Sequence, residues 1–302
     1  MSSASLSIAR AYAACETLAR SHYENFPVAS RLLPAPMRPH VAAVYAFARV
    51  ADDFADEGTA APDVRQAQLR DWRERLHRMA RAGADPAPAS DREELILAAV
   101  VHSIRSLDLP ITLFDDLVSA FGQDTTTTRY ATWCDVLDYC RRSANPVGRL
   151  VLRIAGYRDE ALDRSSDALC TALQLTNFWQ DFGRDWRAGR LYVPREIQDA
   201  CGAKEDDLTR GCMGQTWAQA IDACAAFTRT KFDEGRLVVD AVGGRLRIEL
   251  RLTWLGGMRI LERTVRGRSG LFERRPTLGL ADLPLLGWRA VRWVRQARPS
   301  QS

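Results

Sequence analysis

The sequence has few cysteines and histidines, and those present are dispersed. Seven cysteines and four histidines occur among 302 residues, with no C-x-x-C pair. Structural zinc sites and disulfide frameworks need such residues in close, regular spacing. We therefore expect reduced thiols in a cytoplasmic protein, and any bound metal must be held by oxygen ligands.

Long apolar runs and a strong charge imbalance are also absent. No stretch of about eighteen apolar residues occurs, so we expect no membrane-spanning helix. Met1 to Arg10 are polar and lack the charged start and apolar stretch of a signal peptide. The 42 Lys and Arg against 38 Asp and Glu give a net charge of +4. This surplus is too small to indicate nucleic-acid binding, but it is compatible with an anionic ligand or lipid surface.

Strand signals are nearly absent, and helical periodicity dominates the chain. The sequence is 46% hydrophobic, which is enough apolar material for a large core. No long linker separates two halves, and no repeat of fixed period occurs. We predict an all-α protein in which residues 1–302 form a single domain.

Paired aspartates provide the first functional signal. Two carboxylates four residues apart on a helix share one face and repel each other unless a cation lies between them. The sequence has four such pairs, which are Asp52/Asp56, Asp159/Asp163, Asp163/Asp167 and Asp181/Asp185. The spacing alone is weak evidence, so the neighbouring residues must separate a metal site from an ordinary helix surface.

The sequence context divides these pairs into two kinds. Arg158, Arg164 and other polar neighbours surround Asp159, Asp163 and Asp167, which predicts a solvated helix face. The other two pairs lie in apolar helices, where an unpaired charge is costly. Each extends a polar line along its helix. The first carboxylate line is Tyr45, Arg49, Asp52 and Asp56, and the second carboxylate line is Gln174, Asn177, Asp181 and Asp185.

One polar line of this kind is either a structural network or part of a site, but two in one chain favour a shared site. Carboxylates facing each other across a helical cavity would bind Mg²⁺, which prefers oxygen ligands and completes its shell with substrate phosphates. The ions would neutralise a leaving diphosphate, so that its carbon–oxygen bond breaks to give a carbocation. Arg49 is placed to share the diphosphate charge.

Four motifs, in the same order along the chain, resemble those of the squalene/phytoene synthases. Tyr45–Asp56 resembles the first aspartate-rich motif of that family. Leu173–Asp185, followed by Gly189–Pro194 (GRLYVP), resembles the second. The others are Tyr139–Gly148, which resembles the tyrosine-bearing motif, and His22, Phe26 and Ala29–Pro34, which resemble the N-terminal segment. The resemblance implies an all-α, single-domain isoprenoid-synthase bundle around a central cavity, with Mg²⁺ as cofactor and a prenyl diphosphate as ligand.

The lines of polar residues and the resemblance together assign roles to individual positions. The metal-binding candidates are Asp52, Asp53, Asp56, Asp181 and Asp185. The substrate-binding candidates are Arg49, Gln174, Asn177, Arg184 and Tyr192, with Arg190 beside Tyr192 either contacting substrate or closing a loop over the cavity. The catalytic candidates are Tyr45, Arg49, Tyr139, Ser143 and Asn145.

Departures from the family pattern indicate a branch. Tyr23-Glu24-Asn25 replaces the usual Ser-Lys-Ser, Ser143 and Asn145 interrupt the tyrosine-bearing motif, and Arg184 replaces a frequent Glu. These features resemble the bacterial hydroxysqualene synthases of hopanoid biosynthesis. That branch implies a lyase-type reaction on presqualene diphosphate, in which water captures the rearranged cation and no NADPH is needed. Sister enzymes of the pathway are the protein partners that it implies.

Two of these departures have more than one physical explanation. Ser143 and Asn145 either hold the capturing water or stabilise a helix kink around Pro146. Arg184 either neutralises diphosphate or reduces the number of bound metal ions.

Two other functions remain open. A sister enzyme would condense two farnesyl diphosphates to presqualene diphosphate, or make squalene or phytoene, with the same aspartates. A non-catalytic scaffold relative is the other alternative, but it has no need of four aspartates on apolar helices.

The C-terminal segment is basic and amphipathic over residues 285–302. Leu285 to Arg295 (LLGWRAVRWVR) mixes tryptophans and valines with arginines. This pattern fits a helix on a membrane surface, with arginines at the headgroups, and it equally fits a last helix packed on the core.

Overall fold

A computed structural model describes residues 3–21, 32–56, 58–82 and 91–294. Most of these residues are helical, and the only extended pairing among them is an isolated bridge between Arg129 and Leu191. The predicted all-α class is therefore confirmed. None of the helices in the described ranges is long and apolar enough to cross a membrane. The seven cysteines, all described, form no disulfide.

Contacts within the chain define two compact units, each described by itself. Unit 1 comprises Met1–Thr126 and Pro146–Asp159, and unit 2 comprises Thr127–Asn145 and Glu160–Ser302. The predicted extent of one domain over residues 1–302 and the predicted central cavity stay predictions.

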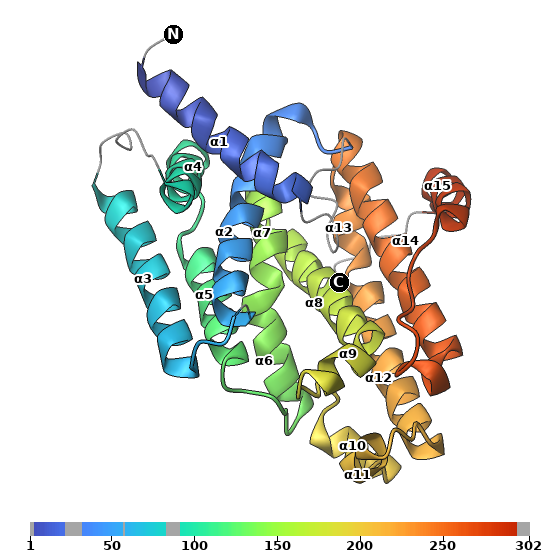
Figure 1. Ribbon diagram of the computed structural model, residues 1–302. Helices are drawn as coiled ribbons and strands as arrows, with labels where there is room; N and C mark the ends of the chain where they lie inside the picture. The colour runs from blue at the N-terminus through green and yellow to red at the C-terminus, as the bar shows by residue number, and fades with distance from the viewer. Residues whose placement is uncertain (1–2, 22–31, 57, 83–90, 295–302) are drawn as a thin grey trace. The chain divides into compact units, whose positions relative to one another are not determined.

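Unit 1 is organised around α2, which contacts α1, α3, α4 and α5 (Figure 1). Its helices are α1 (Ser3–Ser21), η1 (Ala35–Met37), α2 (Arg38–Asp56), α3 (Pro62–Arg81), α4 (Arg92–Leu107), α5 (Thr112–Asp124) and, after its first residue, α7 (Asn145–Ile154). Phe47, Trp72 and Phe114 are fully buried at its centre. The Phe47 ring lies 5.4 Å from the Trp72 ring and 5.2 Å from the Phe114 ring. This apolar core fixes the orientation of α2, which carries the first carboxylate line.

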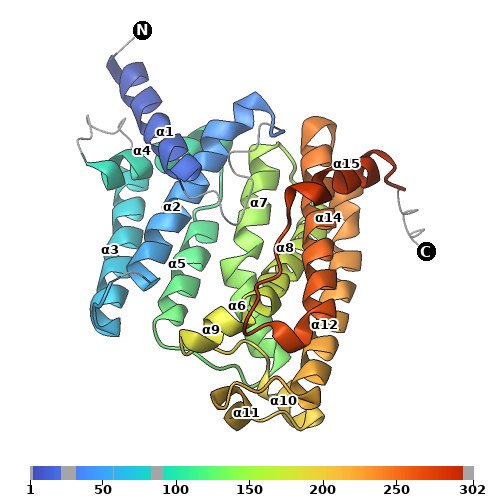
Figure 2. The same cartoon turned by 45° about the vertical axis from the view of Figure 1, so that its right-hand side comes forward.

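Unit 2 is organised around α8, which contacts α6, α12, α13 and α14 (Figures 1 and 2). Its helices are α6 (Trp133–Ser143), α8 (Glu160–Gln180), α9 (Phe182–Arg187), α10 (Arg195–Cys201), α11 (Glu205–Thr209), α12 (Gln215–Glu234), α13 (Arg236–Ala241), α14 (Gly244–Arg266), η2 (Arg268–Gly270), η3 (Leu280–Asp282) and α15 (Leu283–Val291). Trp179, Trp217 and Phe232 are fully buried there. Neighbours on several sides bury most of α8, which carries much of the second carboxylate line.

The solvated face predicted for Asp159, Asp163 and Asp167 is confirmed at Asp159, which is exposed, and is wrong at Asp163, which is buried. The junction between α12 and α13 covers Ser165 and Leu169 on the same helix. Ser165 Oγ donates to the Glu234 carbonyl at 3.0 Å and accepts from the Val238 N–H at 3.0 Å. A side chain on Gly235 would place its Cβ 2.8 Å from Leu169 Cα, so only glycine permits this approach. Ser165 thus belongs to a buried helix junction, whereas its neighbour Arg164 is exposed.

The apolar helix predicted to carry both Asp181 and Asp185 is interrupted at Asp181, where α8 gives way to α9. The backbone of Leu271 and Phe272 lies against Gly183, where a Cβ would come within 2.6 Å of the Leu271 carbonyl oxygen. Hydrogen bonds of helical spacing nevertheless continue across the break. The Asp181 N–H donates to the Asn177 carbonyl at 2.8 Å, and the Asp185 N–H donates to the Asp181 carbonyl at 2.9 Å.

Candidate active site

The first carboxylate line lies on α2 and centres on Arg49. The Arg49 guanidinium is 2.7 Å from Asp53 Oδ1 and 3.5 Å from Asp52 Oδ2. The Asp52 side chain is 40% exposed and that of Asp53 is 30% exposed, although the rest of this helix is largely buried. Tyr45 is half-buried one turn earlier, and Asp56 is exposed at the end of the helix. These carboxylates therefore reach a surface, unlike a buried structural network.

The second carboxylate line contains an ion pair that the sequence did not indicate. Arg275 Nε donates to Asp181 Oδ1, and Arg275 Nη2 donates to Asp181 Oδ2 at 3.1 Å. The Gln180 side chain donates to the Pro276 carbonyl at 2.6 Å, which fixes the same segment against the end of α8. The pairing joins positions 94 residues apart, so no local pattern could reveal it.

A small recess in unit 2 lies between the two parts of the second aspartate-rich motif. Asp185 of α9, Phe178 and the loop residues Arg190 and Tyr192 are among the residues that line it. The structure thus places Arg190 and Tyr192 of GRLYVP beside Asp185 and Phe178. Arg184 is exposed on α9, whereas Gln174 and Asn177 are half-buried on α8.

An aromatic cluster surrounds the predicted catalytic Tyr139. The rings of Phe178 and Tyr192 stack with centroids 3.7 Å apart. The Tyr139 ring lies 5.9 Å from that of Phe178, 6.2 Å from that of Tyr192 and 6.0 Å from that of Tyr130. Aromatic faces carry negative partial charge and attract cations. The cluster is therefore chemically suited to line the path of a carbocation, and Phe178 and Tyr130 were not among the sequence candidates.

Ser143 and Asn145 lie at the junction of α6 and α7. Ser143 is four residues after Tyr139 on α6, so the two share one helix face. Its buried Oγ has no hydrogen-bond partner among the described residues. Asn145 Oδ1 instead accepts from Thr171 Oγ1 of α8 at 3.0 Å. A helix break does occur here, but the Asn145 side chain bonds to another helix and does not stabilise the break through local backbone contacts.

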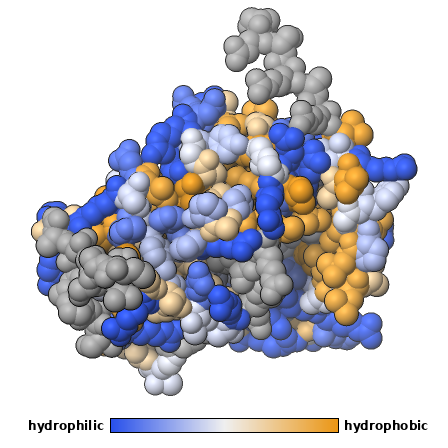
Figure 3. Space-filling view, turned by 90° about the horizontal axis from the view of Figure 1, so that it is seen from above, coloured by the Kyte–Doolittle hydropathy of each residue, from blue (hydrophilic) through white to orange (hydrophobic). Residues whose placement is uncertain are grey.

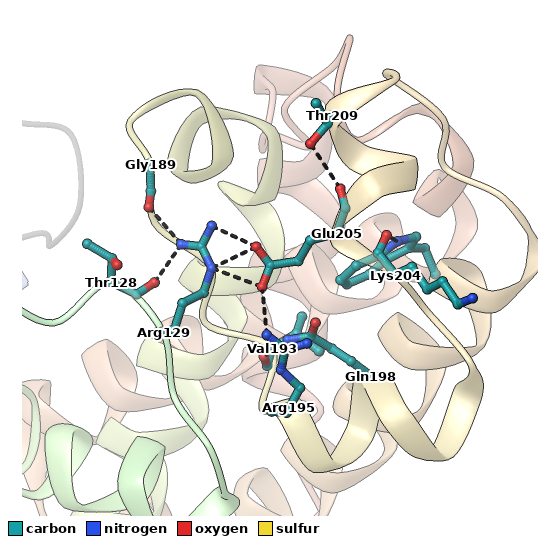
Figure 4. A network of polar contacts seen from close by, with 10 residues as sticks. Thr128, Arg129, Gly189, Val193, Arg195, Gln198, Lys204, Glu205 and Thr209 are labelled. Atoms are coloured by element: carbon teal, nitrogen blue, oxygen red, sulfur yellow. Dashed lines mark hydrogen bonds and ion pairs between the residues drawn. The ribbon is translucent and has the colours of Figure 1, made fainter.

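Arg129 fixes the loop that carries Arg190 and Tyr192 (Figure 4). Its Nη1 donates to the Gly189 carbonyl at 2.7 Å, and its Nη2 lies 2.9 Å from Glu205 Oε2. The Leu191 N–H donates to the Thr128 carbonyl at 2.9 Å on the same side. Sequence reasoning missed Arg129 and Glu205, because the partners are 76 positions apart and have no characteristic spacing.

The donor set of both lines fits a hard cation. Each line contains two carboxylates, and Mg²⁺ is usually held by one or two carboxylates together with water and substrate phosphates. Among the described residues, no three His, Cys, Asp or Glu side chains gather into a metal site by themselves. The residues that would hold Mg²⁺ are Asp52, Asp53 and Asp56 in unit 1 and Asp181 and Asp185 in unit 2. These roles, and the facing of the two lines, stay predictions.

The all-helical fold matches that of known isoprenoid synthases. A crystal structure of squalene synthase HpnC from Alicyclobacillus acidocaldarius aligns with a TM-score of 0.78 at 39% identity, over 86% of this chain and 95% of that one. The hydroxysqualene synthase of Zymomonas mobilis is 40% identical over 209 residues, which is 68% of this chain and 67% of that protein. The hydroxysqualene synthase of Rhodopseudomonas palustris is 34% identical over 256 residues, which is 83% of this chain and 82% of that protein.

The squalene/phytoene synthase family profile matches residues 19–282. This chain belongs to the squalene/phytoene synthase family, and the resemblance drawn from its motifs is confirmed. Enzymes of this family act on prenyl diphosphates and typically use Mg²⁺. The N-terminal motif residues His22, Phe26 and Ala29–Arg31 lie outside the described residues.

Proposed function

We propose that this protein is a hydroxysqualene synthase that converts presqualene diphosphate and water into hydroxysqualene and diphosphate. The carbon–oxygen bond of the substrate breaks, and the diphosphate leaves with the electron pair. The resulting cyclopropylcarbinyl cation rearranges, water adds to it, and the adduct loses a proton. Bound Mg²⁺ would supply charge neutralisation for the departing diphosphate. No carbon is reduced, so the reaction requires no NADPH.

The partnerless Ser143 hydroxyl is the observation that carries this proposal. A buried hydroxyl without a partner costs free energy, and a bound water would restore its hydrogen bond. This hydroxyl is on the helix face of Tyr139, whose ring belongs to the aromatic cluster. A water held there lies beside the path of the cation and is available to capture it. The two relatives named hydroxysqualene synthases support the same branch.

Polar and aromatic side chains of this chain would have separate roles in the rest of the reaction. Arg49 and Arg184 would contact the diphosphate, and Gln174 and Asn177 would support the carboxylates of the second line. Tyr45, Tyr139 and Tyr192 would shield the cation from stray water. The proposed setting is the cytoplasm, with a prenyl diphosphate as ligand and sister enzymes of the pathway as protein partners.

The test incubates the purified protein with presqualene diphosphate and, separately, farnesyl diphosphate, with Mg²⁺ and without NADPH. Hydroxysqualene from presqualene diphosphate, with farnesyl diphosphate left unchanged, is the expected result. Turnover of farnesyl diphosphate would instead assign the chain to a condensing sister enzyme. The observation that favours a condensing enzyme as the second candidate function is that the Alicyclobacillus relative is named a squalene synthase.

A scaffold function is tested without turnover. A ligand that binds the folded state raises its stability by mass action. We expect Mg²⁺ with inorganic diphosphate to raise the melting temperature, and an Asp52→Asn variant to lose this response. A scaffold function would be favoured if Mg²⁺ and inorganic diphosphate left the melting temperature unchanged and neither presqualene diphosphate nor farnesyl diphosphate were converted.

A further inference from the structure

The C-terminal part of unit 2 exposes an unusual amount of apolar surface. Eight large hydrophobic side chains are exposed among the described residues, and six of them lie between positions 278 and 294. Together they form the C-terminal apolar surface, defined as Leu278, Leu280, Leu283, Trp288, Val291 and Val294. Hydrophobic side chains collect on the right-hand side of Figure 3, the side on which α15 lies in Figure 1. Clustered exposed apolar side chains mark an interaction site more often than scattered ones do.

Helix α15 is fixed to the molecule by one face and presents apolar residues on the opposite face. Leu286 and Ala290 are buried, whereas Trp288 is 55% exposed and Val291 is 83% exposed. Just beyond the helix, Trp293 Nε1 donates to Asp240 Oδ1 at 2.7 Å, and its ring packs against that of Trp254. A helix packed on a core normally carries polar residues on its outer face. Its apolar outer face therefore indicates a further partner.

The charge exposed beside this surface is positive. Arg289 and Arg292 are exposed on and just after α15, and the Arg292 guanidinium lies 5.1 Å from the centre of the Trp288 ring. The only acidic residue between positions 278 and 294 is Asp282, which is buried and lies 2.7 Å from Arg263. A partner therefore meets hydrophobic side chains bordered by unopposed arginines.

We infer that the C-terminal apolar surface docks this protein onto the surface of an anionic lipid bilayer. Trp288, Val291 and the leucines would enter the boundary between headgroups and acyl chains, where tryptophan is favoured. Arg289 and Arg292 would contact lipid phosphates. A second copy of this chain fits less well, because a two-fold contact through the same surface brings these arginines toward their own counterparts. The inference does not depend on the proposed reaction.

The test measures co-sedimentation of the full chain with phosphatidylcholine vesicles, with and without phosphatidylglycerol. We expect binding only with phosphatidylglycerol, and weaker binding as salt is raised, because exposed charges are screened beyond about 10 Å at 0.1 M salt.

Arg289→Gln with Arg292→Gln should weaken binding roughly thirty-fold. Trp288→Ser and Val291→Ser should each weaken it roughly tenfold. Because these side chains are exposed, the variants should keep the melting temperature of the unchanged chain.

Matched control variants distinguish binding through the C-terminal apolar surface from non-specific hydrophobic or electrostatic binding to vesicles. Val64 on α3 is 47% exposed outside the surface, so Val64→Ser should bind vesicles like the unchanged chain. Arg70→Gln with Arg78→Gln removes the same charge from exposed positions of α3 and should also have no effect. Equal binding of the surface and control variants would overturn the inference. So would absence of vesicle binding together with a dimer, detected by analytical ultracentrifugation, that Trp288→Ser dissociates.

Discussion

Arg275 holds both carboxylate oxygens of Asp181, through its Nε and through its Nη2 at 3.1 Å from Oδ2. A planar guanidinium facing a carboxylate in this way makes a strong, directional ion pair. Asp181 is therefore occupied by a cationic side chain, and a metal ion must share or displace that contact.

The Arg275–Asp181 pair predicts an altered metal dependence when the arginine is removed. Arg275→Gln should lower kcat/KM about ten- to a hundredfold, because Asp181 loses the hydrogen bonds that orient its carboxylate. A hydrogen bond to a charged group contributes about 1.5–3 kcal/mol. It should also lower the Mg²⁺ concentration needed for half-maximal activity, since the Asp181 oxygens become available. A Mg²⁺ titration of activity checks both effects. Arg275→Lys keeps the positive charge but not the paired guanidinium hydrogen bonds, so both its kcat/KM and its Mg²⁺ requirement should lie between those of the unchanged chain and Arg275→Gln. If Arg275→Gln needs the same Mg²⁺ concentration as the unchanged chain, Arg275 does not compete with Mg²⁺ for Asp181.

We expect the loss of an aspartate charge to lower kcat only when that aspartate belongs to one of the two carboxylate lines. Asp52→Asn or Asp185→Asn should reduce kcat by a hundredfold or more, because charge stabilisation at the leaving group typically contributes about 3–4 kcal/mol. Asp159→Asn is the matched control, since Asp159 has the same D-x-x-x-D spacing but is exposed at the end of unit 1. Steady-state kinetics compares the three variants. Comparable losses in all of them would show that spacing, and not position, sets the effect.

We expect the Ser143 hydroxyl to determine how often the rearranged carbocation is captured by water and how often it loses a proton instead. Ser143→Ala should raise the share of non-hydroxylated hydrocarbons several-fold, as should the double change of Ser143 to Val and Asn145 to Gly. Gas chromatography of the products measures the ratio. Thr171→Val removes the 3.0 Å bond to Asn145 but leaves the serine in place, so it controls for distortion of the α6–α7 junction. A product ratio that Ser143→Ala leaves unchanged would rule out the water-holding role.

The Arg129 contacts predict a linked loss of stability and activity. Arg129→Gln should reduce the free energy of unfolding by about 1–2 kcal/mol, the contribution of charged hydrogen bonds discounted for partial exposure. It should also lower kcat/KM, because the loop that carries Arg190 and Tyr192 loses its bond at Gly189. Urea unfolding and kinetics measure the two effects. Arg141→Gln removes an exposed arginine paired with Asp138 in the same unit and should change neither quantity by much.

A histidine cluster in unit 1 predicts loss of stability in mild acid. Tyr12 Oη lies 3.0 Å from His40 Nδ1 and 2.8 Å from His102 Nδ1, and Ser103 Oγ lies 2.9 Å from His40 Nδ1. Burial, followed by the neighbouring His102, lowers the pKa of His40 below its ordinary 6.5. The unfolded chain then binds more protons than the folded chain below about pH 6.5, so stability falls as the pH decreases through that value.

Thermal melts between pH 7.5 and 5.5 test this sign. The melting temperature should fall over that range, and His40→Asn should flatten the decrease. His77→Asn is the control, because His77 lies apart from this cluster and pairs with Asp115. An equal decrease in the unchanged chain and in His40→Asn would assign the acid sensitivity to other groups.

The sequence alone determined the helical class, the family and the order of its motifs. Helical periodicity and the near absence of strand signals depend on local preferences, which act within a few residues. The steps of three and four that align Tyr45, Arg49 and Asp52 are local in the same sense, and all three do lie on α2. Aspartates on a helix with an otherwise apolar sequence could therefore be recognised without coordinates.

Tertiary structure decided which long-range partners these residues meet. Arg275 on Asp181, Arg129 on Glu205 and Asn145 on Thr171 each join segments brought together by packing, which no spacing rule encodes. Burial also depends on distant segments, because the α12–α13 junction covers Ser165, which its polar sequence neighbours did not indicate. The exposed outer face of α15 also required the fold, since an amphipathic sequence does not state which of its faces a neighbouring helix covers.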